Sequence, residues 1–347
     1  MSQTVILSDP IFDTHTWLGH VEQAERLVAI RNAIASSGLN RDLHHYEVHP
    51  ALESDLQAVH TPRLLAQVRR LASYGGGQFD SDTYVTPDSW EAATLAAGAA
   101  VGAVDAVAGG EVRNAFALVR PPGHHATPSR AMGFCLINNI AVAARYAVRR
   151  LGVARVAIVD YDVHHGNGTQ DIFYDDPHVL FCSTHASPFY PGSGSITEMG
   201  DHAAAPGTTL NVPLPFGTGD RGYRRAFEQV IVPAIRAFRP ELIMVSAGFD
   251  AHWSDPLGPM VLSVTGFARL NQIILDLADE LCGGRVVMSL EGGYNLDALA
   301  ACVVASLRQL IGRSPGQDAI GQVEAPEPDA EVNRVIDILQ DRHPLLR

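Results

Sequence analysis

The chain has 347 residues, is 46% hydrophobic and carries a formal net charge of −13 at pH 7, which leaves ample apolar content for a large core. The acidic balance argues against a phosphate-backbone binder, because such proteins rely on clustered Lys and Arg, so we expect no nucleic-acid partner.

The opening MSQTVILSDP has no basic stretch followed by a long apolar one, and no segment approaches about eighteen uninterrupted apolar residues. We therefore expect a cytoplasmic protein that has no membrane partner. Four cysteines, at positions 135, 182, 282 and 302, lack CxxC spacing. Neither a disulfide framework nor a cysteine zinc site is indicated.

Apolar spacing predicts strands and helices that alternate along the chain. We expect strands at 5–7, 44–48, 115–119, 155–159, 179–183, 241–246 and 285–290. We expect helices at 21–36, 51–59, 62–71, 89–108, 137–150, 223–238, 264–282 and about 330–340, with either a kink or a late first turn at Pro233. The Gly-, Ser- and Pro-rich segment 188–210 predicts a long functional loop, and 313–329 a surface connection to the last helix.

This alternation predicts an α/β fold in which one domain spans 1–347, with a mostly parallel central sheet and helices on both faces.

Residues 156–170, VAIVDYDVHHGNGTQ, begin as a buried strand and end in potential metal ligands. Side chains two apart in a strand point the same way, so Asp160, Asp162 and His164 share one direction. Carboxylate and imidazole ligands suit zinc. A capped loop with solvated carboxylates is the alternative, but so dense a cluster is costly without a cation.

Polar residues also follow other predicted strands, in RPPGHH at 120–125, GFDAH at 248–252 and EGGYN at 291–295. The carboxyl ends of parallel strands meet at one edge of a sheet, so we expect these loops to converge. Asp162, His164 and Asp250 would supply three ligands and leave room for water and substrate, as in a catalytic zinc site. Asp160 could instead orient a neighbour.

The pair His124-His125 is the natural general acid and base beside such a metal, although adjacent histidines in a loop can be structural. Tyr294 could donate a hydrogen bond to a developing oxyanion, although a tyrosine in this context more often packs. Phe134 and Tyr190 are candidates for apolar walls, although isolated aromatic residues usually belong to a core.

The motifs RPPGHHA, GFCLINN, DYDVHHGNGTQ, GFDAH and EGGYN stand in this order between residues 120 and 295. They resemble the successive motifs of the zinc-dependent histone deacetylase family, with features of its class II-like bacterial histone deacetylase-like amidohydrolases and acetylpolyamine amidohydrolases. The resemblance extends more weakly from residue 5 to about 312. It implies the arginase/deacetylase fold and hydrolysis of an N-acyl amine, either acetyl-lysine in peptides or proteins or an acetylated polyamine, to a carboxylate and a free amine.

The resemblance also implies residue roles. It assigns zinc to Asp162, His164 and Asp250. It assigns proton transfer chiefly to His125, an electrostatic role to His124 and polarisation of the acyl carbonyl to Tyr294. Asp160 matches the buried acid that partners the first histidine. Asn167 stands where class I members have a second Asp, and this neutral partner should leave His125 less biased toward its charged form.

The resemblance further implies a substrate tunnel and bound potassium. Phe134 and Tyr190 match the aromatic pair of the tunnel, and Tyr190 replaces the phenylalanine that is common in nuclear deacetylases. Gly133 lies beside them, Leu257 matches a further wall residue, and Asp82 falls near an acidic rim residue. Potassium ions are implied by the family pattern alone, near Asp160, Asp162, His164, Ser183 and Thr184, and near Phe173 and Val179.

Three alternatives stay open. The first is an amidase or esterase that acts on small molecules. The second is an arginase-like hydrolase with two manganese ions, whose second metal needs extra acids. His165 and His252 stand in the relevant loops, and only Asp160 and Asp255 remain nearby. The third is a catalytically silent protein that binds acyl-lysine. The sequence leaves the oligomeric state open, and this includes a homo-oligomer.

Overall fold

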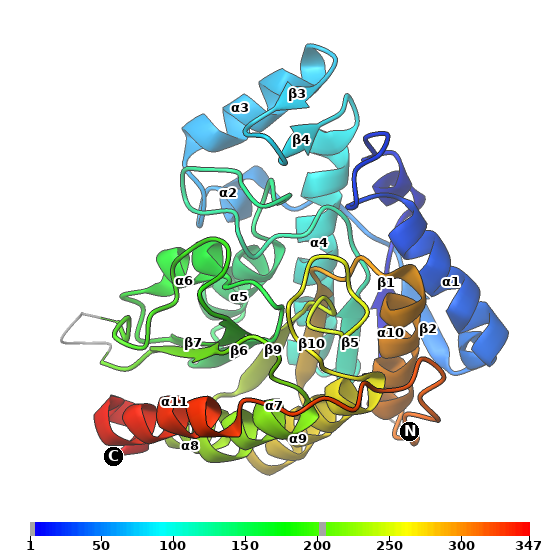
Figure 1. Cartoon of the computed structure of the whole chain (residues 1–347). Coiled ribbons are helices and arrows are strands. Elements are labelled where there is room, and N and C mark those ends of the chain that lie inside the picture. The colour runs from blue at the N-terminus through cyan, green and yellow to red at the C-terminus, as the bar shows by residue number, and fades with distance from the viewer. Residues whose placement is uncertain (1–3, 201–205) are drawn as a thin grey trace.

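A parallel sheet runs through the centre of the protein in the computed structural model (Figure 1), which describes residues 4–200 and 206–347. Within these residues the sheet has eight strands in the order β2-β1-β5-β10-β9-β6-β7-β8, and every neighbouring pair is parallel. The strands are β1 (Thr4–Leu7), β2 (Leu43–Tyr46), β5 (Asn114–Ala117), β6 (Val156–Asp160), β7 (Val179–Ala186), β8 (Thr209–Leu214), β9 (Leu242–Ala247) and β10 (Val286–Leu290).

Helices form two groups that pack on the sheet. Helices α4 and α5 pack on each other, α4 against β1, β5 and β10, and α5 against β6 and β9. Helix α10 packs against both α1 and α9, and it contacts β5 while α9 contacts β9. The helices are α1 (Glu25–Ser37), α2 (Glu53–Leu56), α3 (Pro62–Ser73), α4 (Ser89–Ala108), α5 (Asn139–Arg150), α6 (Asn167–Phe173), α7 (Asp220–Ala226), α8 (Val232–Phe238), α9 (Val264–Cys282), α10 (Leu296–Leu310) and α11 (Asp329–Arg342). The α/β class predicted from the sequence is confirmed.

Helix α4 is the one helix among the described residues that is long and apolar enough to cross a membrane, yet 72% of its most apolar window is buried inside the protein. Its small residues allow close packing. A Cβ atom on Gly98 would lie 1.8 Å from the carbonyl oxygen of His49, and Thr94 O accepts a hydrogen bond from Ala51 N at 2.9 Å. The apolar composition of α4 is therefore accounted for by its place in the core.

Four adjacent central strands, β5, β10, β9 and β6, deliver the polar motifs. These strands read as continuous apolar runs because both faces of the sheet are covered. The register aligns their ends: Asp160 at the end of β6 pairs with Ser246 of β9, and Leu290 at the end of β10 pairs with Ala247. The predicted convergence of the loops follows from this order.

The predicted helix at 223–238 is interrupted. It forms α7, a π-helical turn at Phe227–Ile231 and α8, which has Pro233 in its first turn. Proline has no N–H to donate to the carbonyl four residues earlier, which belongs to Gln229. That carbonyl accepts a hydrogen bond from Gln340 Nε2 of α11 instead, at 3.1 Å. Of the two readings of Pro233, the structure shows the late first turn, since this residue stands in the first turn of α8 after the π-helical turn.

Other boundaries differ from the prediction. Within the predicted helix 51–59, only α2 is helical. Strand β8, helix α6 and the small antiparallel pair of β3 (Gly77–Gln78) and β4 (Tyr84–Val85) were not expected. Strand β8 contains Pro213, which is tolerated because β8 lies at the edge of the sheet. Residues 201–205 of the predicted loop 188–210 lie outside the described part of the chain.

Buried neutral histidines connect loops through hydrogen bonds. His60 accepts a hydrogen bond from Asn138 N at 2.9 Å through Nε2, and its Nδ1 faces Thr127 O at 3.0 Å. Burial lowers the pKa of His60 to about 4, although the bond to Thr127 opposes this shift. Burial likewise lowers the pKa of His15 to about 3. Both histidines are therefore uncharged in the folded protein at neutral pH.

We expect the free energy of unfolding to fall as the pH drops from about 6.5 toward 4, because the unfolded chain binds protons on these histidines and the folded protein does not. For His60 the loss is about 3 kcal/mol. His60→Gln should therefore flatten the pH dependence by about that amount. Urea unfolding of metal-free protein across this range measures it, with exposed His44→Gln as the control. Equal pH dependence in His60→Gln and the wild type would contradict the assignment.

Candidate metal centre and active site

Asp162, His164 and Asp250 form a cluster of three potential metal ligands, the one such group among residues 4–200 and 206–347. His164 Nδ1 lies 3.0 Å from Asp162 Oδ1 and 3.1 Å from Asp250 Oδ2. Ligands of a tetrahedral zinc with bonds of about 2.0–2.1 Å are separated by roughly 3.3 Å. The donor set and its spacing therefore fit a zinc ion.

Backbone amides orient both carboxylates of this cluster. Gly292 N donates to Asp162 Oδ2 at 2.9 Å, and Val163 N donates to Asp250 Oδ1 at 2.8 Å. A Cβ atom on Gly292 would lie 2.2 Å from Asp250 Oδ2, so only glycine fits there. Burial and the neighbouring Asp162 raise the pKa of Asp250 to about 7. The cluster thus gathers two buried carboxyl groups and one imidazole at the spacing of metal ligands, and a bound cation would stabilise the carboxyl groups in their charged form.

The two adjacent histidines have different partners. His124 Nδ1 lies 2.9 Å from Asp160 Oδ2, and its Nε2 lies 3.8 Å from Asp162 Oδ1. His125 Nδ1 donates to Asn167 Oδ1 at 2.8 Å. An Nδ1–H donor leaves Nε2 of His125 with a free lone pair. The predicted pairing of His124 with Asp160 and of His125 with Asn167 is the one observed.

Because their surroundings differ, the two histidine rings differ in charge. Burial alone would lower the pKa of His124, but Asp160 and Asp162 outweigh it and raise the pKa to about 10. Burial lowers the pKa of His125 well below its ordinary value, and the positive charge of His124 acts in the same direction. The arrangement places a cationic ring beside a neutral one that can accept a proton.

Tyr294 is held from several sides. Asp255 Oδ2 accepts hydrogen bonds from Tyr294 N at 2.6 Å and Asn295 N at 3.1 Å. The guanidinium carbon of Arg26 lies 4.9 Å from the centre of the Tyr294 ring, and the Phe134 ring meets it edge-on at 5.7 Å. Burial raises the pKa of Tyr294 well above its ordinary value, so its hydroxyl stays protonated and can donate.

A pocket of about 240 Å³ joins the predicted tunnel residues to these groups. Its wall includes Gly133, Phe134, Tyr190, Leu257 and Asp82, together with His124, His125, His164 and Tyr294. Gly133 has φ +56, and a Cβ atom there would lie 2.4 Å from His125 Cδ2. Glycine at this position therefore lets the loop pass close to the His125 ring.

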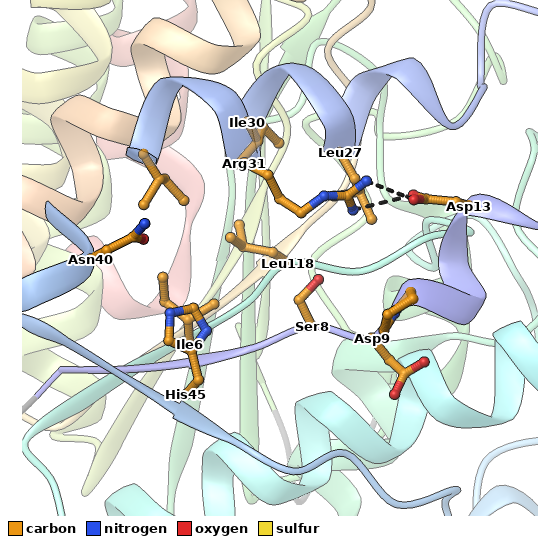
Figure 2. Close-up of a pocket in the computed structure, with 12 residues that line it drawn as sticks. Ile6, Ser8, Asp9, Asp13, Leu27, Ile30, Arg31, Asn40, His45 and Leu118 are labelled. Atoms are coloured by element: carbon orange, nitrogen blue, oxygen red, sulfur yellow. Dashed lines mark hydrogen bonds and ion pairs between the residues drawn. The ribbon is translucent and has the colours of Figure 1, made fainter. Parts of the chain in front are cut away.

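A larger hollow of about 440 Å³ lies between α1 and the edge of the sheet (Figure 2). Aliphatic side chains such as Ile6, Leu27 and Ile30 form much of its wall, and Arg31 pairs with Asp13 beside it at 2.6 Å. It contains none of the metal-ligand cluster or the histidine pair. Chemistry rather than size therefore identifies the smaller pocket as the candidate active site.

A buried charged cluster that was not predicted from the sequence lies behind Tyr294. Arg26 Nε donates to Gly293 O at 2.7 Å and its Nη2 donates to Glu291 O at 2.5 Å. Glu22 accepts from Arg26 at 3.1 Å and from Arg120 Nε at 2.5 Å. The charge of Arg120 overcomes the effect of burial and lowers the pKa of Glu22 to about 2. An arginine inside an apolar helical pattern gave no signal of this role.

Phe189 was also missed. Its ring stacks on His164 at 5.1 Å, and it lines the same pocket as its neighbour Tyr190. Tyr190 meets the His125 ring edge-on at 5.2 Å. The sequence FYPG offered two adjacent aromatic residues, and only the turn of the loop shows that both face the site.

The residues implied for potassium lie in two places. Ser183 pairs in register with Asp160, and the buried hydroxyl of Thr184 makes no hydrogen bond within the described residues. Phe173 ends α6 and Val179 begins β7, on either side of one turn. Oxygen donors are therefore present near Asp160, and both potassium sites stay predictions.

Most side-chain atoms of the extra ligands proposed for a two-metal site have other hydrogen-bond partners. His165 contacts Ser193 and Gln170, at 2.8 and 3.0 Å. Asp255 accepts the Tyr294 and Asn295 amides, and His252 Nδ1 contacts Ser254 at 2.9 Å. The buried Nε2 of His252 has no hydrogen-bond partner among residues 4–200 and 206–347, where Asp162, His164 and Asp250 are the one group at metal-ligand spacing.

Comparison with known proteins shows which family this chain resembles. Residues 20–310 match the histone deacetylase domain family. The chain is 41% identical over 315 residues to a histone deacetylase-like amidohydrolase of Pseudomonas aeruginosa, covering 90% of this chain and 83% of that protein. It is 40% identical over 280 residues to a probable deacetylase of Archaeoglobus fulgidus, covering 80% and 77%.

The solved crystal structure of the HDA15 HD domain superposes with a TM-score of 0.90 at 37% identity, covering 99% of this chain and 98% of that chain. The chain therefore belongs to the histone deacetylase family.

Proposed function

We propose that this protein hydrolyses an N-acyl amine in a zinc-dependent reaction, releasing a carboxylate and a free amine. The substrate class is acetyl-lysine in peptides or proteins, or an acetylated polyamine. One observation carries the proposal: a three-ligand cluster lies beside a narrow pocket that also exposes a neutral histidine and a tyrosine hydroxyl. Membership of the deacetylase family supports the same chemistry.

Asp162, His164 and Asp250 would hold the metal, and a zinc ion there would activate a water molecule and polarise the acyl carbonyl. His125 Nε2 accepts a proton from the attacking water, because Asn167 holds the ring with Nδ1 as the donor. The water oxygen bonds to the acyl carbon, and Tyr294 donates a hydrogen bond to the carbonyl oxygen as charge develops on it.

The C–N bond then breaks, and the proton held by His125 passes to the leaving nitrogen. The cationic His124 stabilises negative charge throughout, since Asp160 keeps its ring oriented. Phe134, Phe189 and Tyr190 enclose the acyl chain and limit access of bulk water.

Tyr294→Phe and His125→Ala should each lower kcat on an acetyl-lysine peptide by about 10²–10⁴-fold, since each removes a group that acts on the reacting atoms. Acetate release by protein with measured zinc content tests this. Near-normal turnover in both variants would make the assignment wrong.

Metal-depleted protein reloaded with zinc should bind one ion per chain and recover activity, and Asp250→Ala should lose tight binding because a ligand is removed. Elemental analysis after gel filtration measures the stoichiometry. Two manganese ions per active chain would instead support the arginase-like alternative.

A panel of acyl-lysine peptides, N-acetylpolyamines and simple esters should show turnover of short acyl amides, because a pocket of about 240 Å³ has little room beside the metal ligands. Comparison of kcat/KM across the panel identifies the substrate class. Peptide binding without acetate release, at full zinc content, would favour a silent acyl-lysine binder.

A further inference from the structure

We propose that Glu291 is a positioning residue: its carboxylate fixes the backbone that carries His124 and His125 relative to the loop that carries Tyr294. The inference deepens the proposed function and rests on it for the roles of the histidines. The hydrogen bonds of Glu291 that suggest it are seen in the structure and do not depend on the proposed reaction.

Glu291 follows β10 directly and its side chain is fully buried. Its Oε2 accepts hydrogen bonds from Gly123 N at 2.7 Å and His124 N at 3.1 Å. Its Oε1 accepts from the hydroxyl of Ser246 at 3.3 Å. One carboxylate thus joins the loop after β5 and strand β9 to the end of β10.

The backbone N–H and carbonyl groups of Glu291 are also hydrogen-bonded. Glu291 N donates to Ala247 O at 3.1 Å, and its carbonyl accepts from Arg26 Nη2 at 2.5 Å. The next amide, Gly292 N, donates to the metal-ligand candidate Asp162. The carboxylate is therefore anchored to the same segment that leads to Tyr294 and supports the metal cluster.

The loop at 121–124 depends on this acceptor. Buried backbone N–H groups need partners, and two successive ones here point at Glu291. On its other side the loop is pressed against the start of α5, where Asn139 Nδ2 donates to Pro121 O at 3.0 Å. A Cβ atom on Gly123 would lie 2.5 Å from Asn139 N. Loss of the carboxylate would release one side of a tightly packed loop and let His124 shift.

Geometry and charge can be separated by substitution. In Glu291→Gln the amide oxygen can accept from Gly123 and His124 while its NH₂ group donates to the Ser246 hydroxyl, so the shape is kept without the charge. Glu291→Ala removes the acceptor altogether. Glu291→Asp keeps the carboxylate but has a side chain shorter by one methylene, so the carboxylate lies farther from the two amides. This variant replaces Glu291→Ala in the experiment if the alanine variant does not fold.

A matched control is Glu327→Ala. Glu327 is also a carboxylate that accepts several backbone amides, from Gly219, Arg221 and Gly222 at the start of α7. It contacts neither the histidine pair nor the metal-ligand candidates, so it reports the general effect of losing such an acceptor.

The first measurement is kcat and KM on an acetyl-lysine peptide, with zinc content determined for each variant. We expect Glu291→Ala to lower kcat on the order of 10–100-fold at full zinc occupancy, since a small misplacement of a catalytic group has effects of this size. KM should change much less, because Glu291 does not line the pocket. Glu291→Gln should recover most of the loss, and Glu327→Ala should keep kcat.

The second measurement does not depend on turnover. In zinc-loaded protein labelled with ring-¹⁵N histidine, the Nδ1–H resonance of His124, assigned with His124→Gln, reports its hydrogen bond to Asp160. We expect the resonance to shift or broaden in Glu291→Ala and to stay in place in Glu291→Gln and Glu327→Ala.

Unchanged kcat and an unchanged resonance in Glu291→Ala would overturn the inference, as would a loss confined to zinc content. A loss in Glu291→Gln as large as in Glu291→Ala would also overturn it, by showing that charge rather than position matters. An inactive wild type whose resonance responds as expected would instead refute the proposed function and leave the positioning role intact.

Discussion

The burial of several carboxyl groups at the ends of adjacent strands is the constraint on which the rest of this structure depends. Asp160, Asp162, Asp250 and Glu291 are all fully buried and all lie where β6, β9 and β10 end. A desolvated carboxylate costs several kcal/mol unless it is paired or hydrogen-bonded. Backbone amides, the cationic His124 and the proposed metal ion each neutralise part of this charge, and the loops are folded to deliver them.

The same charge distribution gives two chemically similar histidines different properties. His124 faces carboxylates and is driven toward its charged form, whereas His125 is buried beside the cationic His124 and has the neutral Asn167 as its partner. A proton acceptor and a fixed positive charge thus sit side by side, with ring centres 4.0 Å apart. The two side chains are chemically the same, so their different proposed roles, proton acceptor for His125 and stabilising charge for His124, follow from their different partners.

Long-range contacts from the first part of the chain complete the site. Arg26 of α1 binds the carbonyls of Glu291 and Gly293, about 265 positions away, and shares Glu22 with Arg120. This buried cluster fixes the loop of Tyr294 from behind. Removing one member of such a cluster leaves an unpaired buried charge, so the active-site loops and the stability of the fold depend on the same contacts.

Local patterns in the sequence were enough to predict the α/β class, most of the alternating strands and helices, and the residues that gather at the sheet edge. Period and composition are local properties, and apolar runs ending in DYDVHH or GFD mark strands that deliver ligands. Features that depend on contacts between distant segments could be seen only in the folded structure. These are the strand order that makes β5, β10, β9 and β6 neighbours, the edge strand β8 with its proline, the facing of Phe189 toward His164, and the parts played by Arg26 and Glu291. Nothing in the local pattern around Arg26 or Glu291 records which backbone groups their side chains will meet, because those groups come from elements that only folding brings together.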